Sequence, residues 1–272
     1  MAATPIGNLG DASPRLAAVL AGADVVLCED TRETGKLCAA LGVKAALLAY
    51  HDHNAERVRP AALARLAAGE AVCLVSDAGT PLISDPGYKL VRAARDAEIP
   101  VFAVPGPSAA IAALSVAGAP TDRFFFAGFP PAKPGAREAF FAGLNAIDAT
   151  LIFYETGPRL AASLAAMADA FGDRRAAVAR ELTKRFEETV EGSLATLAER
   201  YASAPPKGEI VVVVHPPAAP PADAADLDAF LADALQSMSV KDAAAAAADA
   251  LGVAKKTAYA AALALQRAGR DP

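Results

Sequence analysis

The feature that most constrains the fold of this chain is the alternation of short apolar runs with longer alanine-rich stretches of helical periodicity. The runs lie at 25–28, 71–75, 101–104, 124–126, 150–154, 176–179 and 209–214. This alternation predicts α/β layers, with helices expected at 60–68 and 87–97 in the first half. Because ligands of open α/β sheets bind beyond the carboxyl ends of the strands, the polar and glycine-rich loops that end these runs are the expected site.

Breaks in composition divide the 272-residue chain, which is long enough for about two domains with buried cores. We predict one α/β domain at 1–117 and a second at 118–215, with a cleft between them. A proline- and alanine-rich linker at 216–225 is expected to be stiff and extended. The tail at 226–272 is predicted to be helical, with Gly252 separating two helices in a helix-turn-helix arrangement.

Composition excludes several classes of protein. No apolar run approaches the roughly 18 to 20 residues that a membrane span requires, so no membrane partner is expected. The three cysteines show no Cys-x-x-Cys spacing and no basic, apolar leader opens the chain, which together predict free thiols and a cytoplasmic location. The absence of a Gly-x-Ser-x-Gly elbow, a Walker loop and a Cys/His nucleophile pair argues against the commonest hydrolases and NTPases.

The most informative loop runs from Ser76 to Gly87, directly after a predicted strand. It contains two aspartates, two glycines and two prolines, so its backbone can approach a ligand closely while the loop stays rigid. The segment 105–108 repeats this pattern, and its Ser108 is compatible with an N-cap, a ligand contact or both. By contrast, the turn at 5–11 lacks the full Gly-x-Gly-x-x-Gly spacing of a dinucleotide site.

Three charged or polar segments leave their role open. Asp30 follows a strand at a predicted helix start, where a capping role is as reasonable as a functional one. His51 and His53 have the spacing of residues on one face of a strand, but without a third ligand nearby we expect a polar, substrate-facing loop and no metal. The charge run at 181–188 is typical of a solvated face, although its first residues follow another predicted strand.

Taken in order, nine segments resemble one family. They are 3–11, 29–32, 50–54, 76–81, 84–88, 105–109, 153–155, 179–184 and 207–210. The set resembles the tetrapyrrole-methylase superfamily of S-adenosylmethionine-dependent methyltransferases, and within it the ribosomal RNA small subunit methyltransferase I group, which 2'-O-methylates cytidine 1402 of 16S rRNA. The resemblance runs from Ala3 to about Val214, and the tail is similar to the small helix-turn-helix domain often attached to that group.

The resemblance implies a two-domain tetrapyrrole-methylase-like fold that holds S-adenosyl-L-methionine in the cleft between the domains. The cofactor-binding residues that it implies are Pro5, Gly7, Asp77, Ala78, Gly79, Thr80, Ser108, Ala109, Tyr154, Leu182, Lys207 and Gly208. The residues that it places on the acceptor side are Glu29, Asp30, Arg32, His51, His53, Asn54, Asp85 and Glu155, and Arg159 matches a position of the adjoining loop. It also implies a homodimer.

Methyl transfer to a ribose hydroxyl requires an in-line methyl donor and a group that takes the hydroxyl proton. The cofactor supplies the leaving group, so the protein must orient the reactants, exclude water and accept one proton. From their positions at strand ends, Asp30 and Glu155 are the predicted proton acceptors. Lys184 is predicted to favour the developing alkoxide electrostatically.

An acidic chain with 26 Lys+Arg against 31 Asp+Glu needs local basic clusters if it is to bind the phosphates of 16S rRNA in the small subunit. One such cluster lies at the end of the sequence, between residues 251 and 272. It contains four basic residues, Lys255, Lys256, Arg267 and Arg270, and one acidic residue, Asp271. A second set is expected to rim the cleft: Arg123, Lys133, Arg137, Arg174, Arg175, Lys184 and Arg185. The competing interpretation is that these charges only keep the protein in solution.

Two other functions are compatible with the sequence, namely a methyltransferase of the same fold that acts on a tetrapyrrole or other small molecule, and a non-catalytic RNA-binding module. The chain also departs from the family pattern, because only Met1, Ala2 and Ala3 stand where a buried, branched strand is expected. We expect either that a shorter segment completes the sheet or that the natural start lies upstream, and we favour the second.

Overall fold

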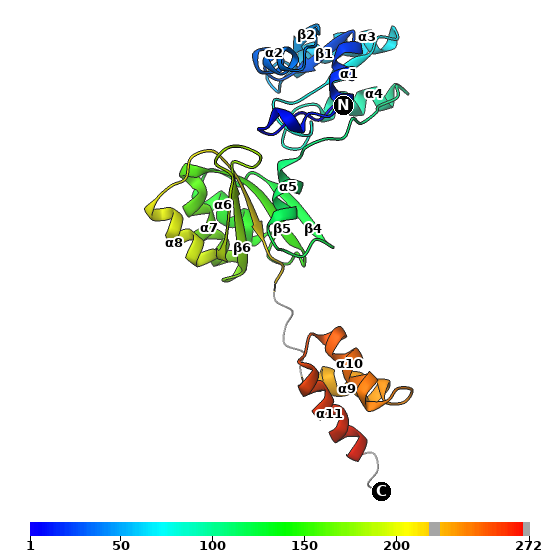
Figure 1. Cartoon of the computed structure of the whole chain (residues 1–272), viewed down its shortest axis with the longest axis vertical. Helices are drawn as coiled ribbons and strands as arrows, with labels where there is room; N and C mark the ends of the chain where they lie inside the picture. Colours follow the sequence, from blue (N-terminus) through cyan, green and yellow to red (C-terminus); the bar gives the residue numbers. More distant parts are fainter. Residues whose placement is uncertain (218–223, 269–272) are drawn as a thin grey trace. The chain divides into compact units, whose positions relative to one another are not determined.

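The computed structural model describes residues 1–217 and 224–268 (Figure 1). Its internal contacts divide the chain into two compact units, residues 1–216 and 217–272. The first unit contains two β-sheets with their helices, which confirms the predicted α/β class. Helix α5 (Ala109–Val116) packs on the second sheet, although its sequence falls inside the predicted first domain.

The first sheet is parallel, with the strand order β2-β1-β3. Its strands are β1 (Val25–Cys28), β2 (Leu47–Ala49) and β3 (Val72–Leu74). Alternate residues of β1 enter two separate cores, with Val26 and Cys28 on one face and Val25 and Leu27 on the other. The helical elements of this part are η1 (Leu9–Asp11), α1 (Pro14–Gly22), α2 (Thr31–Ala40), α3 (Ala55–Ala67) and α4 (Tyr88–Asp96). Burial on both faces explains why these strands are apolar throughout.

The chain start lies beside β3 and extends the hydrogen bonding of this sheet. The Ala2 amide donates to the Leu74 carbonyl at 2.9 Å, and the Ala3 amide donates to the Val104 carbonyl at 3.1 Å. The predicted strand at 101–104 is wrong, because this segment forms only a single bridge, between Ala2 and Val104. A strand requires a ladder of consecutive pairs, and this segment pairs in that way only at Val104.

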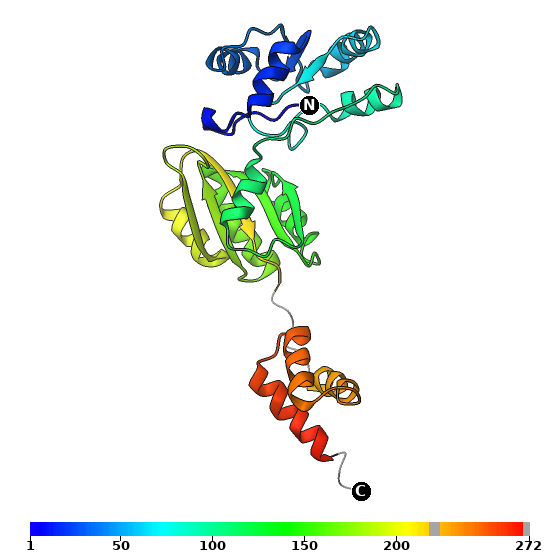
Figure 2. The same cartoon turned by 45° about the vertical axis from the view of Figure 1, so that its right-hand side comes forward.

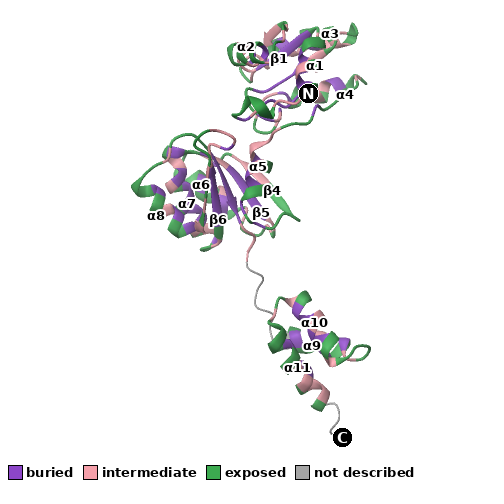
Figure 3. Cartoon of the chain, viewed as in Figure 1, coloured by how far each residue is buried: buried purple, intermediate pink, exposed green. Residues whose placement is uncertain are grey.

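The second sheet is mixed, with the strand order β4-β5-β8-β6-β7. Its strands are β4 (Phe124–Gly128), β5 (Thr150–Thr156), β6 (Arg175–Arg180), β7 (Glu188–Ser193) and β8 (Glu209–Val214). Helices α6 (Pro134–Ala142), α7 (Gly157–Phe171) and α8 (Leu194–Ser203) cover one face, and α5 covers part of the other (Figure 2). Figure 3 shows the resulting burial along the central strands.

Three sequence expectations differ from the structure of the first unit. Helix α3 begins at Ala55 and contains Pro60, which was expected to start it. The end of the charge run forms strand β7, whose residues alternate between half-buried and exposed because it lies at the sheet edge. The segment 127–135, expected to be irregular throughout, contributes residues to β4 and begins α6 at Pro134, a helix position where proline fits well.

The second unit is a small bundle of α9 (Ala224–Ala234), α10 (Val240–Leu251) and α11 (Lys255–Ala268). Its core combines Leu227 and Leu231 with alanines of α10 and α11, whose small side chains let the helices approach closely. Ser239 caps α10, and Gly252 ends it in the left-handed conformation at φ 65°. Residues 218–223 of the predicted linker and the predicted tail charges Arg270 and Asp271 lie outside the described residues. In the described residues, no helix is both long and apolar enough to cross a membrane.

Candidate functional site

A pocket of about 270 Å³, which we call the central pocket, lies where loops of the first sheet meet the second sheet. Its walls come from the loop after β3, the start of α5, the ends of β5 and β6 and the beginning of β8. The lining residues are Ile6, Ala78, Gly79, Thr80, Ile83, Ser84, Asp85, Ser108, Ala109, Phe129, Tyr154, Glu155, Thr156, Ala179, Leu182, Gly208, Glu209, Ile210 and Val211. The site therefore draws on segments that are far apart in sequence, as expected for a ligand held between two sheets.

Most of the predicted cofactor residues line this pocket. They are Ala78, Gly79, Thr80, Ser108, Ala109, Tyr154, Leu182 and Gly208. Pro5, Gly7 and Asp77 instead line a second cavity of about 310 Å³, which we call the side pocket and which also contacts Lys184 and Glu209. Lys207 lines neither pocket, although its carbonyl accepts a hydrogen bond from Arg180 at 3.4 Å.

The loop after β3 is held in an unusual backbone conformation. Gly79 has φ 81° and Gly87 has φ 130°, values that favour glycine, whereas Leu82 at φ 75° and Ser84 at φ 65° occupy the left-handed region at a cost. Two threonine hydroxyls fasten the loop, since Thr4 donates to the Ser76 carbonyl at 3.2 Å and Thr80 donates to the Pro107 carbonyl at 2.9 Å. The pocket wall is thus strained but anchored to both neighbouring segments.

Tyr154 forms the aromatic side of the central pocket. Its ring meets Phe126 edge-on at 4.8 Å and Phe129 at 5.4 Å between centroids. Burial raises the pKa of its phenol, which also contacts the Ala110 amide and the Ser108 side chain. Ser108 occupies the N-cap position of α5, but its side chain makes no capping hydrogen bond, so the capping interpretation of this serine is wrong. Ser108 lines the central pocket instead.

Glu155 is buried, and its carboxylate is fully engaged by the protein. It accepts hydrogen bonds from the Ser163 hydroxyl at 2.5 Å and from the Thr156 amide at 2.8 Å, and it pairs with Arg159 at 3.3 Å. Arg159 also donates to the Pro130 carbonyl, on the loop that follows β4. This network ties β5, α7 and the Phe129 loop together, so the carboxylate is placed to hold structure and lacks a free oxygen for proton transfer.

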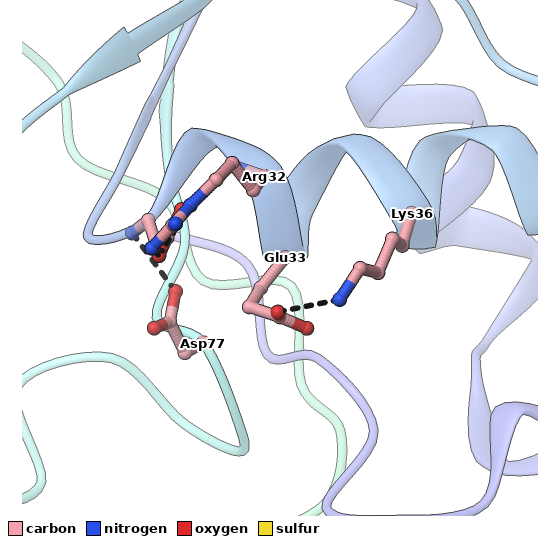
Figure 4. Close-up of polar contacts among 5 residues, drawn as sticks. Arg32, Glu33, Lys36 and Asp77 are labelled. Atoms are coloured by element: carbon pink, nitrogen blue, oxygen red, sulfur yellow. Dashed lines mark hydrogen bonds and ion pairs between the residues drawn. The ribbon is translucent and has the colours of Figure 1, made fainter.

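Asp30 caps helix α2, which is the alternative that the sequence left open. Its carboxylate accepts a hydrogen bond from the Arg32 amide at 2.8 Å and pairs with the Arg32 guanidinium at 2.5 Å. These hydrogen bonds from Arg32 lower the pKa of Asp30 well below its usual range. The Asp30 amide donates to the Asp77 carboxylate at 3.0 Å, near the Glu33–Lys36 pair (Figure 4). Asp30 lines neither pocket, and an acid of such low pKa is a poor proton acceptor.

Lys184 lies against Gly7, where a Cβ would come within 2.5 Å of its Cγ. Its ammonium binds Glu181 at 2.9 Å and Glu209 at 3.0 Å. Burial alone would lower the pKa of Lys184, but these two hydrogen bonds raise it on balance, so the side chain keeps its charge. The residue borders the side pocket and is absent from the lining of the central one.

Asp85 is the predicted acceptor-side residue that lines the central pocket without being held by a cation. Burial raises its pKa to about 6, with a partly opposing contribution from the Ser76 hydroxyl and a further rise from the charges of Glu29 and Asp77. Burial likewise raises the pKa of Glu29, which lines neither pocket. Asp85 therefore changes its charge closer to neutral pH than an ordinary aspartate.

The histidine segment forms a turn after β2, outside both pockets. The Asn54 side chain holds this turn by accepting a hydrogen bond from the His51 amide at 2.9 Å and donating to the Ala49 carbonyl at 3.0 Å. The His51 and His53 rings meet edge-on at 6.0 Å. Across residues 1–217 and 224–268, no group of three or more His, Cys, Asp or Glu side chains is arranged to hold a metal ion.

The basic residues expected at the cleft are mostly elsewhere. Of that set, only Lys184 borders a pocket, while Arg137 is buried and Arg123 pairs with Asp148 at 2.9 Å. Lys255 and Lys256 are exposed at the start of α11 in the second unit. The other predicted acceptor-side residue, Arg32, is exposed and bound to Asp30.

Several pocket residues were not predicted from the sequence: Ile6, Ile83, Ser84, Phe129, Thr156, Ala179, Glu209, Ile210 and Val211. Some of them lie within the nine recognised segments, so position next to a matched motif was an available signal for Ile6, Ser84 and Glu209. Phe129 carried no such signal, because it stands in a proline- and glycine-rich stretch and its ring is half-exposed, at 51%.

Comparison with known proteins places this geometry in context. Residues 1–198 match the profile of the Tetrapyrrole (Corrin/Porphyrin) Methylases, and residues 221–266 match the RsmI C-terminal HTH domain. The methyltransferase CobJ has a similar fold, with a TM-score of 0.58 and 20% identity over 79% of this chain and 92% of its own. A uroporphyrin-III C-methyltransferase from Thermus thermophilus, complexed with S-adenyl homocysteine, gives a TM-score of 0.52 and 19% identity over 78% of this chain and 94% of its own.

Relatives of higher identity carry one name, ribosomal RNA small subunit methyltransferase I. The protein from Mesorhizobium japonicum is 49% identical over 95% of this chain and 89% of its own length. That from Erythrobacter litoralis is 50% identical over 97% and 94%, and that from Pseudomonas aeruginosa is 46% identical over 99% and 97%. The profile match across most of the chain and the near-full-length similarity to these relatives agree with the pocket between two β-sheets. The chain therefore belongs to the ribosomal RNA small subunit methyltransferase I family of the tetrapyrrole methylases.

Proposed function

We propose that this protein transfers the methyl group of S-adenosyl-L-methionine to the ribose 2'-hydroxyl of cytidine 1402 in the 16S rRNA of the small ribosomal subunit. Membership of the family makes the chain a methyltransferase that uses S-adenosyl-L-methionine and acts on ribosomal RNA. The observation that carries the proposal is near-full-length similarity, at 46 to 50% identity, to relatives of that name.

The central pocket suits the cofactor in its shape and its chemistry. Small residues, Ala78, Gly79, Ala109 and Gly208, line it where a ligand must approach the backbone. Apolar walls from Ile6 and Leu182 and the ring of Tyr154 suit an adenine and a methionine chain. A uroporphyrin-III C-methyltransferase of the same fold holds the demethylated product, S-adenyl homocysteine, which supports a cofactor site in this architecture.

The residues around the pocket have separable roles in this proposal. The loop from Asp77 to Thr80 and the start of α5 at Ser108 and Ala109 hold the methionine part of the cofactor. Tyr154, Leu182 and Gly208, which line the central pocket, are assigned to the adenine side. Pro5 and Gly7, which line the side pocket, and Lys207, which lines neither, are assigned to the cofactor by the family resemblance alone. The bound cofactor supplies an electrophilic methyl group, so the protein orients the ribose, excludes water and accepts the proton that the hydroxyl releases.

Lys184 and Glu155 keep roles that fit their contacts. Lys184 holds Glu181 and Glu209, and through Glu209 it helps to fix one wall of the central pocket. Glu155 positions the Phe129 loop through Arg159. Glu29, Asp30 and Arg32 at the start of α2, and His51, His53 and Asn54 in the turn after β2, are assigned to contact with the RNA strand.

The basic residues of the C-terminal tail are expected to bind the RNA in addition to the residues near the central pocket. Lys255 and Lys256 are exposed at the start of α11, where they are free to contact backbone phosphates.

We place the protein in the cytoplasm, in keeping with its three free, buried cysteines. We also propose that it acts as a homodimer on the assembled small subunit. Sedimentation of the purified full chain tests the dimer, since a monomer at micromolar concentration contradicts it.

The experiment that tests the function presents three acceptors to the purified protein with radiolabelled S-adenosyl-L-methionine. The acceptors are small subunits that lack the modification, naked 16S rRNA and a precorrin. We expect label only on the subunits, at the 2'-oxygen of cytidine 1402 by ribose-methylation mapping. Label on the precorrin contradicts the RNA assignment, and the absence of label on every acceptor contradicts methyl transfer altogether.

A further inference from the structure

Three carboxylates line the central pocket, and they differ in their partners. Glu155 pairs with Arg159 at 3.3 Å and accepts the Ser163 hydroxyl, while Glu209 pairs with Lys184 at 3.0 Å. Asp85 has no Lys, Arg or His within ion-pair distance in residues 1–217 and 224–268. A proton acceptor needs an oxygen that is not already held by a cation, which singles out Asp85.

The surroundings of Asp85 favour a proton acceptor rather than a structural acid. It lies in the strained loop after β3, one residue beyond Ser84, which has φ 65°. The titratable groups that face it are Glu29 after β1, Asp77 in its own loop and Tyr154 on β5, and the Ser76 hydroxyl lies beside it. These neighbours bring no positive charge, so the Ser76 hydroxyl alone among them stabilises the ionised form.

We propose that Asp85 is the catalytic residue that takes the proton of the ribose hydroxyl, an inference that rests on the proposed function. The hydroxyl oxygen forms a bond to the methyl carbon of the cofactor, and the carbon–sulfur bond breaks with its electron pair retained by sulfur. The hydroxyl proton passes to the Asp85 carboxylate, so the sulfonium and the carboxylate both become neutral. Asp85 then returns its proton to solvent when the products leave.

This assignment gives a role to the one of the three pocket carboxylates that is not paired with a cation in the described residues. An ionised Asp85 attracts the positive sulfonium in the ground state and receives a proton as that positive charge disappears. Its raised pKa brings the carboxyl closer to the pH at which the enzyme works, where a base accepts a proton most effectively. Asp30 and Glu155, predicted from strand-end position alone, lack this combination of pocket exposure and freedom from a cation.

The test measures single-turnover methyl transfer to unmodified small subunits by the full-length wild type and by Asp85→Asn. We expect Asp85→Asn to lower the rate by about 10² to 10⁴-fold. We also expect its affinity for S-adenosyl homocysteine, measured by calorimetry, to change by no more than about twofold, which shows that the pocket is intact. Asp96→Asn, on the exposed face of α4 and outside both pockets, is the matched control and should keep the wild-type rate.

The pH profile provides a second readout, and its wild-type part does not depend on whether the variant folds. The wild-type rate should rise with pH around a midpoint near 6, and this rise should be absent in Asp85→Asn. A wild-type rate in Asp85→Asn, or a wild-type profile that is flat from pH 5 to 7, overturns the assignment while leaving the proposed function in place. No transfer by the wild type to any acceptor overturns the proposed function, and the role of Asp85 with it.

Discussion

Acidic residues with similar positions at strand ends have different fates in this protein. Asp30 caps a helix, Glu155 anchors an arginine, and Asp85 faces the central pocket without a cation. What separates them is the partner that each side chain meets in the folded protein, because hydrogen bonds and ion pairs hold the charged form while burial opposes it. At the scale of a single residue, function is therefore decided by contacts that local sequence does not contain.

Replacing Glu155 should affect stability more than it affects proton transfer. Glu155→Gln keeps the side-chain shape but removes the charge that pairs with Arg159, so we expect a loss of about 1 to 3 kcal/mol in the free energy of unfolding. Denaturant unfolding measures this loss. The pH dependence of single-turnover methyl transfer should retain its midpoint near 6, and loss of that midpoint would show that Glu155 is the base.

Asp85 should leave a signature in the pH dependence of stability. Its folded-state pKa of about 6 lies above the value of about 3.9 expected for an unfolded chain, so the folded protein binds the proton more tightly. The stability that this proton contributes is fully present below pH 4 and is lost as pH rises through 6. Relative to Asp85→Asn, the wild-type Tm should fall between pH 4 and pH 7, and a constant difference across that range contradicts the raised pKa.

The elements of the fold follow from sequence where both faces of a strand are buried. The runs that became β1 and β3 are apolar throughout, and those that became β5 and β8 have apolar centres, so their pattern predicts strands without knowledge of their partners. The edge strand β7 carries charged and half-exposed residues and was not predicted; its first residue, Glu188, ended the charge run. Conversely, the run at 101–104 has the composition of a strand but forms only one bridge, at Val104.

The residues of the candidate site also divide into those that the sequence predicts and those that depend on contacts in the folded protein. The segment 77–80 could be predicted because it follows β3 and loops at strand ends converge in α/β folds. The segment 108–109 also lines the central pocket, but the strand expected before it does not form, so its place was implied by the family resemblance. Phe129 could not, because its place depends on the Arg159 contact to the Pro130 carbonyl. The grouping of Lys184 with Glu181 and Glu209 likewise needed the pairing of β6 with β8.

The N-cap of helix α10 is expected to contribute to the stability of the second unit. The Ser239 hydroxyl accepts a hydrogen bond from the Asp242 amide at 3.2 Å and starts α10. Ser239→Ala should destabilise this unit by about 1 kcal/mol because that amide loses its partner. Differential scanning calorimetry of the full chain measures the change, with Ser237→Ala, an exposed serine of the preceding turn, as the control. Equal destabilisation by both variants would show that the cap contributes nothing.

At the scale of the whole molecule, the formal net charge of −5 must be reconciled with binding to RNA. Each lysine that binds a phosphate releases condensed counterions, so it steepens the dependence of affinity on salt. In the full-length protein, the pair Lys255→Ala and Lys256→Ala should reduce the slope of log affinity against log salt by about one for each phosphate that the variant no longer binds. Lys44→Ala, an exposed lysine outside the described pockets, is the control, and an unchanged slope in the double variant contradicts a role for the tail.

Every role assigned above depends on S-adenosyl-L-methionine binding in the pocket between the two sheets of the first unit. Isothermal titration calorimetry of the folded wild type and of Ala109→Phe, whose larger side chain is expected to fill the pocket, measures this binding. We expect the wild type to bind S-adenosyl-L-methionine and its demethylated product at a single site per chain, and Ala109→Phe to bind neither while keeping the wild-type circular dichroism spectrum. A folded wild type without affinity for either molecule, or an Ala109→Phe variant that binds as tightly as the wild type, would contradict the account.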